Sequence, residues 1–215
     1  MLEARTLRAG GLAAGVAWLS GVAMTLLTKG ADVQASQTVE LKDKLLAIVH
    51  TQPDLLLKVM GCDTLFVLGY ATVFTALYAV VPRDGRTLAA VGLGFGLLAA
   101  LCDMVENVLY GVYGLAGLHH VPVTVELPFH YYVSSLKWVS AFGAVGLLTL
   151  VFPRRNWFEG LLTLVMASFP LGGALSIAFP DLLPLRALFF VVGMPLFAIL
   201  FFRRAAGRGP AEAFA

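Results

Sequence analysis

The chain has 215 residues, of which 59% are hydrophobic and only 13% are charged, and its mean hydropathy is +0.85. A soluble domain carries about 25% charged residues, so this composition excludes an ordinary soluble protein and indicates an integral membrane protein. A spanning helix needs roughly 20 apolar residues, and the length leaves no room for a separate soluble catalytic domain. The formal net charge of +2 gives no reason to expect nucleic acid as a partner.

Apolar runs bounded by charged residues or proline predict an all-α bundle of six transmembrane helices, which we expect to form one domain over residues 1–215. The expected spans are about residues 8–28, 55–81, 87–118, 125–152, 157–179 and 184–202.

The loop after the first predicted span also has helical periodicity. Its apolar residues recur at helical spacing and are Leu41, Leu45, Ile48 and Val49. They predict a short amphipathic helix over about residues 38–51, lying on the outer membrane surface. A solvated connector and a cover over a cavity are the two alternatives for this segment.

The arginines predict the orientation of the chain, because cytoplasmic loops are enriched in Lys and Arg. The arginines that lie between or beyond the predicted spans on one side of the bundle are Arg5, Arg8, Arg83, Arg86, Arg154, Arg155, Arg203, Arg204 and Arg208. The opposite loops mix lysine with acidic residues. We therefore expect a multi-pass protein of the cell membrane with both its N-terminus and its C-terminus in the cytoplasm.

Glycine and proline predict where helices approach each other or bend. Gly92, Gly94 and Gly96 should bring the third helix against a neighbour and close the cytoplasmic half of the bundle. Pro170 and Pro195 should kink the last two helices.

Charged residues lie deep inside the second, third and fourth predicted spans. At about 1.5 Å of rise per residue, Asp103 falls near the membrane midplane and Glu106 lies one turn toward the exterior. The same count places Asp63 and Lys137 at nearly the depth of Glu106. A charge that faces lipid costs a few kcal/mol or more, so we expect these four side chains to converge in one enclosed chamber.

Helical spacing predicts the other residues that line this chamber. The candidate catalytic residues are Asp103, Glu106, Asp63 and Lys137. The expected substrate-binding residues are Asn107, Tyr70, Tyr110, His130, Tyr131, Ser134 and Trp138, with Tyr132 as a further aromatic neighbour. The chamber should open outward, where His119, His120, His130 and Glu126 are expected to gather.

This set of charges predicts acid–base chemistry. One lysine neutralises only one carboxylate well, and burial favours the neutral acid. At least one carboxyl should therefore hold a proton near neutral pH, as a general acid or a proton carrier must. The plainer alternative is that these polar contacts only hold helices together.

Several other kinds of site are disfavoured by the sequence. Carboxylates at i and i+3 with an imidazole could bind a cation, but neither HxxxH nor ExxH occurs, and we expect no metal. All four histidines are expected at or beyond the exterior boundary, which disfavours haem. An ion pair is a simpler role for Lys137 than a Schiff base with retinal. A single intramembrane lysine also argues against a diphosphate substrate.

Two further pairs of residues leave weaker alternatives. Ser134 with His130 one turn away leaves a hydrolase as an alternative. Cys62 and Cys102 could form a disulfide, which nothing else in the sequence supports.

The favoured hypothesis is a cofactor-independent membrane enzyme. It would isomerise, cyclise or hydrate an apolar lipid or isoprenoid-like substrate that enters from the outer leaflet. A proton-coupled transporter or channel, which could form a homodimer, is the first alternative. A non-catalytic membrane subunit is the second. A closed cytoplasmic half would favour the enzyme over the transporter.

Overall fold

The computed structural model describes residues 2–28, 42–122, 127–179 and 189–207, which form helices and short connections without any strand. Some predictions lie outside these residues. They are the first part of the interfacial helix (residues 38–41), the edges of two spans (residues 125–126 and 184–188), Glu126 and Arg208.

Six of the described helices are long and apolar enough to cross a membrane, which confirms the prediction of an all-helical, multi-span protein. They are α1 (Leu2–Thr28), α3 (Pro53–Val80), α4 (Arg86–Leu118), α5 (Leu127–Val151), α6 (Trp157–Ala178) and a last helix in which the π-helical η5 (Phe189–Gly193) continues into α8 (Met194–Ala206). Each of them overlaps one predicted span. The short 3₁₀ helix η3 (Arg83–Gly85) joins α3 to α4.

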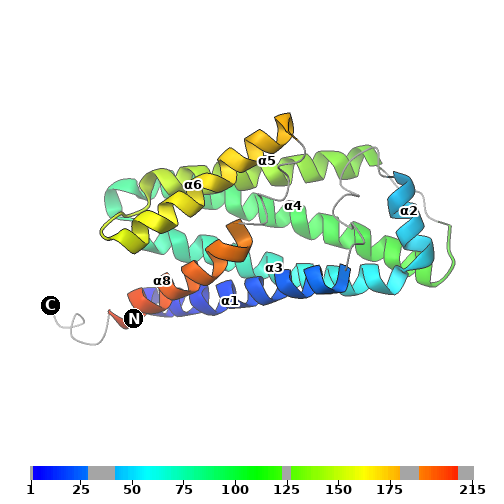
Figure 1. The fold of residues 1–215 in the computed structure, drawn as a ribbon, viewed down its shortest axis with the longest axis horizontal. Coiled ribbons are helices and arrows are strands. Elements are labelled where there is room, and N and C mark those ends of the chain that lie inside the picture. The colour runs from blue at the N-terminus through cyan, green and yellow to red at the C-terminus, as the bar shows by residue number, and fades with distance from the viewer. Residues whose placement is uncertain (1, 29–41, 123–126, 180–188, 208–215) are drawn as a thin grey trace.

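Most helices pack beside their neighbours in the chain (Figure 1). Helix α3 packs against α1 and α4, and α5 packs against α4 and α6. Helix α8 returns beside α1, while η5 contacts α6. The start of α1 and the end of α8 therefore lie at one end of the bundle, together with the α3–α4 and α5–α6 connections. This end is called the arginine end below, because the described arginines of the predicted cytoplasmic side lie there.

The short helix α2 (Lys42–Thr51) lies at the opposite end, across α3 and α4. Its Leu45 and Val49 side chains are fully buried. Val49 packs over Gly117 of α4, where the absence of a side chain lets the two backbones approach closely. Helix α2 is therefore held against the bundle by an apolar face.

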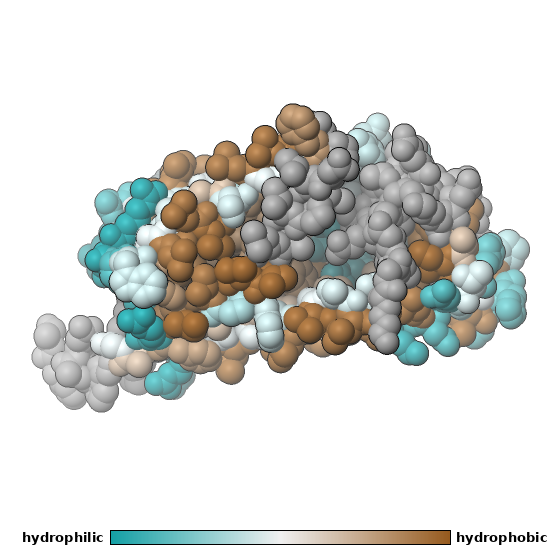
Figure 2. Space-filling model, viewed as in Figure 1, coloured by the Kyte–Doolittle hydropathy of each residue, from teal (hydrophilic) through white to brown (hydrophobic). Residues whose placement is uncertain are grey.

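A large apolar core fills the half of the bundle nearer the arginine end. Phe169, Phe197 and Phe201 are almost fully buried there, and the rings of Phe169 and Phe189 lie 4.6 Å apart between centroids. Figure 2 shows a broad hydrophobic surface between two hydrophilic ends, as expected for helices that face lipid.

The glycines of α4 only partly follow the prediction. A methyl group on Gly96 would lie 2.6 Å from the Phe74 ring, and one on Gly92 would lie 3.1 Å from Leu148 Cγ, so both positions are close helix contacts. Gly94 was wrongly included, because nothing lies within 4 Å of the corresponding position. Three successive alternate residues of a helix cannot all face one neighbour.

The two prolines differ in their effect. Helix α6 continues through Pro170. The irregular π-helix before Pro195 ends at Gly193, where the sequence predicts a bend.

The contact between α1 and α3 can be tested at Gly69. A methyl group there would lie 2.8 Å from both Ala13 O and Ala17 Cβ, whereas Gly61 of the same helix has open space around it. We expect Gly69→Ala to lower the free energy of unfolding by about 1–3 kcal/mol through overpacking, and Gly61→Ala to lower it by much less. Thermal unfolding in detergent measures both, and equal effects would contradict the packing of α1 on α3.

Candidate functional site

Helix α4 carries a buried polar stripe across its middle. Asp103, Glu106, Asn107 and Tyr110 follow one another at helical spacing and are all buried. Apolar residues of the same part of the helix, such as Leu101 and Val108, are exposed on the outer surface. The sequence therefore turns the carboxyl groups inward by placing lipid-facing residues on the other side of the helix.

Lys137 of α5 lies between two carboxylates of α4. Its Nζ is 3.0 Å from Asp103 Oδ1 and also bonds Glu106 Oε2. Asp103, Glu106 and Lys137 are 8%, 1% and 7% exposed, so the three charges are removed from the surface. In such surroundings the attraction between opposite charges is strong. It offsets the loss of hydration only because the partners are well placed.

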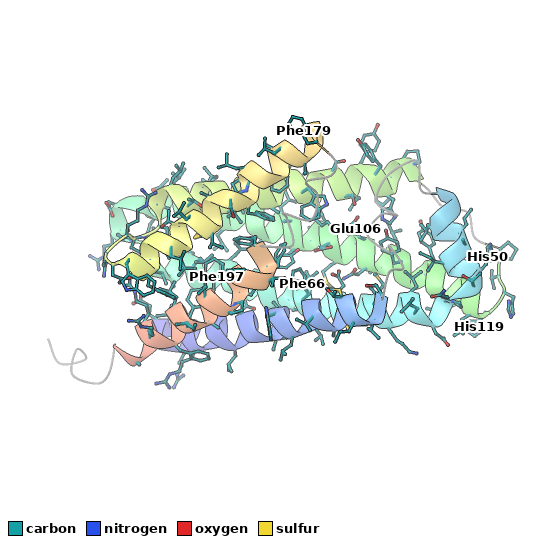
Figure 3. The ribbon with its side chains drawn as sticks, in the orientation of Figure 1. His50, Phe66, Glu106, His119, Phe179 and Phe197 are labelled. Carbon is teal, nitrogen blue, oxygen red and sulfur yellow. The ribbon has the colours of Figure 1, made fainter. Side chains whose placement is uncertain are left out.

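Neutral side chains complete the binding of these two carboxylates. The Tyr70 hydroxyl of α3 donates to Asp103 Oδ2 at 2.9 Å, and Ser134 Oγ of α5 donates to Glu106 Oε1. All oxygens of both carboxylates therefore have a partner. The network joins three helices, and Figure 3 shows Glu106 inside the bundle, between α4 and α5.

His130 is the unsatisfied member of this site. Its side chain is 2% exposed and packs edge to face on Tyr110, with 4.7 Å between ring centroids. Its Nε2 lies 3.5 Å from Glu106 Oε1, and neither ring nitrogen has a hydrogen-bond partner within the described part of the chain. The site thus ends in a buried imidazole that still has hydrogen-bonding capacity beside a carboxylate.

Asp63 of α3 lies at the edge of the cluster. It is half-buried, and its polar neighbours are Asn107, Asp103 and Lys137. Asn107 Nδ2 donates a long hydrogen bond of 3.4 Å to Thr64 Oγ1. The four intramembrane charges that the sequence places at similar depth are therefore brought together.

The predicted aromatic lining is only partly assembled. The Trp138 ring is half-buried, with its centroid 5.5 Å from Lys137 Nζ, so this tryptophan borders the site. Tyr131 and Tyr132 are 45% and 71% exposed and lie on the outer surface instead. Depth alone does not determine which way a side chain faces around the helix.

The predicted cluster of histidines at an outer mouth needs correction. His119 and His120 are exposed at the end of α4, and Figure 3 shows His119 beside α2, far from Glu106. His130 belongs to the buried site instead, because α5 begins before it and turns it inward. His130 is the third residue of the span Pro128–Val151, so it lies near the end of that span although its side chain is buried.

Metal and thiol chemistry receive no support from the geometry. Among the described residues, no group of three or more His, Cys, Asp or Glu side chains is arranged to hold a metal ion. Cys62 and Cys102 are both free thiols rather than a disulfide.

A second buried ion pair was missed by sequence reasoning. Glu159 of α6 is 2% exposed and pairs with Arg204 of α8 at the arginine end. The spacing Asn156-x-x-Glu159 was a usable signal, because it matches a helix-capping pattern. Indeed Asn156 Oδ1 accepts the Glu159 N–H at 3.0 Å.

Comparison with known proteins gives no relative from which a function could be inferred. No protein-family model, no curated protein and no solved structure matches the chain. The function must therefore be inferred from the site itself.

The ion network can be tested at Lys137. Lys137→Met leaves two buried carboxylates without a cation, and we expect it to lower the free energy of unfolding by about 3 kcal/mol. Adding Asp103→Asn and Glu106→Gln to this variant should restore most of the loss, because the two carboxylates that Lys137 contacts directly are then neutral. Thermal unfolding in detergent measures both effects.

Lys58→Met is the matched control, since Lys58 is exposed on α3. The network would be disproved by a Lys137→Met variant as stable as this control.

Proposed function

We propose that this chain is an integral membrane enzyme that performs acid–base chemistry on an apolar lipid or isoprenoid-like substrate. The observation that carries the proposal is the buried Asp103–Lys137–Glu106 network beside the unsatisfied imidazole of His130. Ion pairs between helices do not by themselves require a buried imidazole that lacks a hydrogen bond to every described residue.

His130, which has no hydrogen-bond partner among the described residues, is where we place the polar group of the substrate. Leaving a buried polar group without a partner costs about 1–3 kcal/mol, and such groups in native proteins call for an explanation. A hydroxyl or carbonyl oxygen of the substrate would satisfy the imidazole and would lie close to Glu106. Tyr110, Ser134, Asn107 and Trp138 would line the space around the apolar part.

The carboxyl groups supply the proton chemistry. Three carboxyls share one lysine, so the cluster can hold a proton and a negative charge at once. Asp103 or Glu106 would donate the proton to a carbon–carbon double bond. The ionised partner, or Asp63, would stabilise the resulting cation or remove a proton from the neighbouring carbon. Isomerisation and cyclisation need only these steps in a dry site, and no cofactor. Hydration needs in addition one water molecule, which would add to the cation and give up a proton to the ionised carboxylate.

The packing of the arginine half favours an enzyme over a proton-coupled transporter. Phe74, Leu77, Leu148 and Phe201 fill the bundle between the site and that end, and each is less than 10% exposed. A transporter must open its site to both sides of the membrane. A site reached from one side is sufficient for an enzyme whose substrate arrives through the lipid.

We further infer that the arginine end faces the cytoplasm and that α2 lies on the exterior surface, so that the substrate enters from the outer leaflet. In a variant without native cysteines, His119→Cys should react with a membrane-impermeant maleimide in intact cells. Arg154→Cys should react only after permeabilisation. The opposite labelling pattern would reverse the orientation.

The catalytic proposal is tested by the lipids of cells that express the chain. We expect the wild type to change the ratio of a lipid to its isomer, cyclised or hydrated product, as measured by mass spectrometry. Asp103→Asn and Glu106→Gln should lower that conversion at least 100-fold, since a positioned acid or base contributes about 10²–10⁴-fold. Asp54→Asn, which changes an exposed acid of α3, should retain it.

Thermal unfolding must show that all variants remain folded. If cells that express the folded Asp103→Asn and Glu106→Gln variants keep the wild-type lipid ratios, the network only holds the helices together. Proton-dependent substrate movement across liposomes without chemical change would instead support the transporter.

A further inference from the structure

A hollow at the arginine end separates the start of α6 from the end of α8. Its volume is about 180 Å³, several times the roughly 30 Å³ that one water occupies. The lining residues are Asn156, Phe158, Glu159, Leu200, Arg203 and Arg204. None of them belongs to the polar site in the middle of the bundle.

The acid in this hollow is already fully engaged. Glu159 pairs with Arg204, and its Oε2 accepts the backbone N–H of Arg155 at 2.8 Å. Glu159 thereby holds the Arg204 side chain in the wall of the hollow. It has little capacity left to neutralise a second arginine.

The remaining arginines leave an excess of positive charge. Arg203 is exposed and lies over the Phe158 ring, with its Cζ 5.5 Å from the ring centroid. It has no acidic partner among the residues that the structure describes. Arg154 and Arg155 are exposed just before α6. An anion is therefore the complement of this hollow.

The surroundings indicate an anion that carries acyl chains. The two helices that frame the hollow expose large apolar side chains in their next turns: Leu161 and Leu164 on α6, and Ile199 and Phe202 on α8. Trp157, at the start of α6, is 79% exposed. Tryptophan is enriched where a membrane protein meets the lipid headgroups. The hollow thus lies at headgroup level, beside surface that acyl chains cover.

We propose that this hollow binds the headgroup of an anionic phospholipid from the leaflet at the arginine end. The Arg203 guanidinium contacts the phosphate oxygens. Arg204, which Glu159 holds in place, forms part of the wall of the hollow beside it. Basic pockets between transmembrane helices bind such headgroups by the same charge complementarity. This inference does not depend on the proposed enzyme activity.

The test is a titration of the full-length, delipidated protein with phosphatidylglycerol, followed by native mass spectrometry. We expect saturable binding that phosphatidylcholine does not reproduce. Arg203→Gln should weaken the apparent affinity about fivefold, the contribution of one basic residue at a lipid surface.

Arg86→Gln is the matched control, because Arg86 is also exposed at the arginine end and lies over an aromatic ring, that of Tyr78, at 5.8 Å. This control should bind like the wild type. An equal loss in both variants would overturn the proposal, because general attraction to a basic surface would then explain the binding. Displacement of the lipid by millimolar inorganic phosphate would also overturn it, since the hollow would then be a site for the free anion.

Discussion

The position of Lys137 between Asp103 and Glu106 is the contact on which the rest of the bundle depends. Charges inside a membrane must be neutralised within the protein, because no water is available around the helices. The Lys137 side chain satisfies this condition for two carboxylates at once. A shift of one helical turn between α4 and α5 would separate them, so the network fixes the register of these two helices.

The network also reaches the last helix through aromatic contacts. Tyr70, which donates to Asp103, packs edge to face on Phe66 at 5.4 Å, and Phe66 packs on Phe190 of η5 at 5.0 Å. The Val191 carbonyl of η5 accepts a hydrogen bond from Trp18 of α1 at 3.1 Å. The irregular π-helical turn is therefore held by side chains from α1 and α3, next to the site.

The bundle thus divides into two parts with different tasks. The half near the arginine end is a closely packed apolar core. The centre holds polar groups of α3, α4 and α5 that bond to one another. In the proposed enzyme, close packing around the site would keep the acid and base groups in a productive geometry. Helix α2, held by Leu45 and Val49, covers the smaller apolar cluster at the other end.

Much of the fold could be predicted from the sequence, because hydropathy is a local property and each span can be recognised from its own residues. The meeting of Asp103, Glu106 and Lys137 could also be predicted, since their depths agree and burial of unpaired charge is costly. The direction in which Tyr131 and Gly94 face could not be predicted. The rotation of a helix about its axis depends on neighbours that are far away in the sequence. The place of His130 in the site could be predicted, because it shares one helical stripe with Ser134 and Lys137.

An experimental density map of the chain in a lipid nanodisc would test the central claim most directly. The account predicts Lys137 Nζ between the Asp103 and Glu106 carboxylates, and density that does not belong to the protein within hydrogen-bonding distance of the His130 imidazole. Side chains of Asp103, Glu106 and Lys137 that point to separate partners, with His130 bonded only to the chain itself, would contradict it.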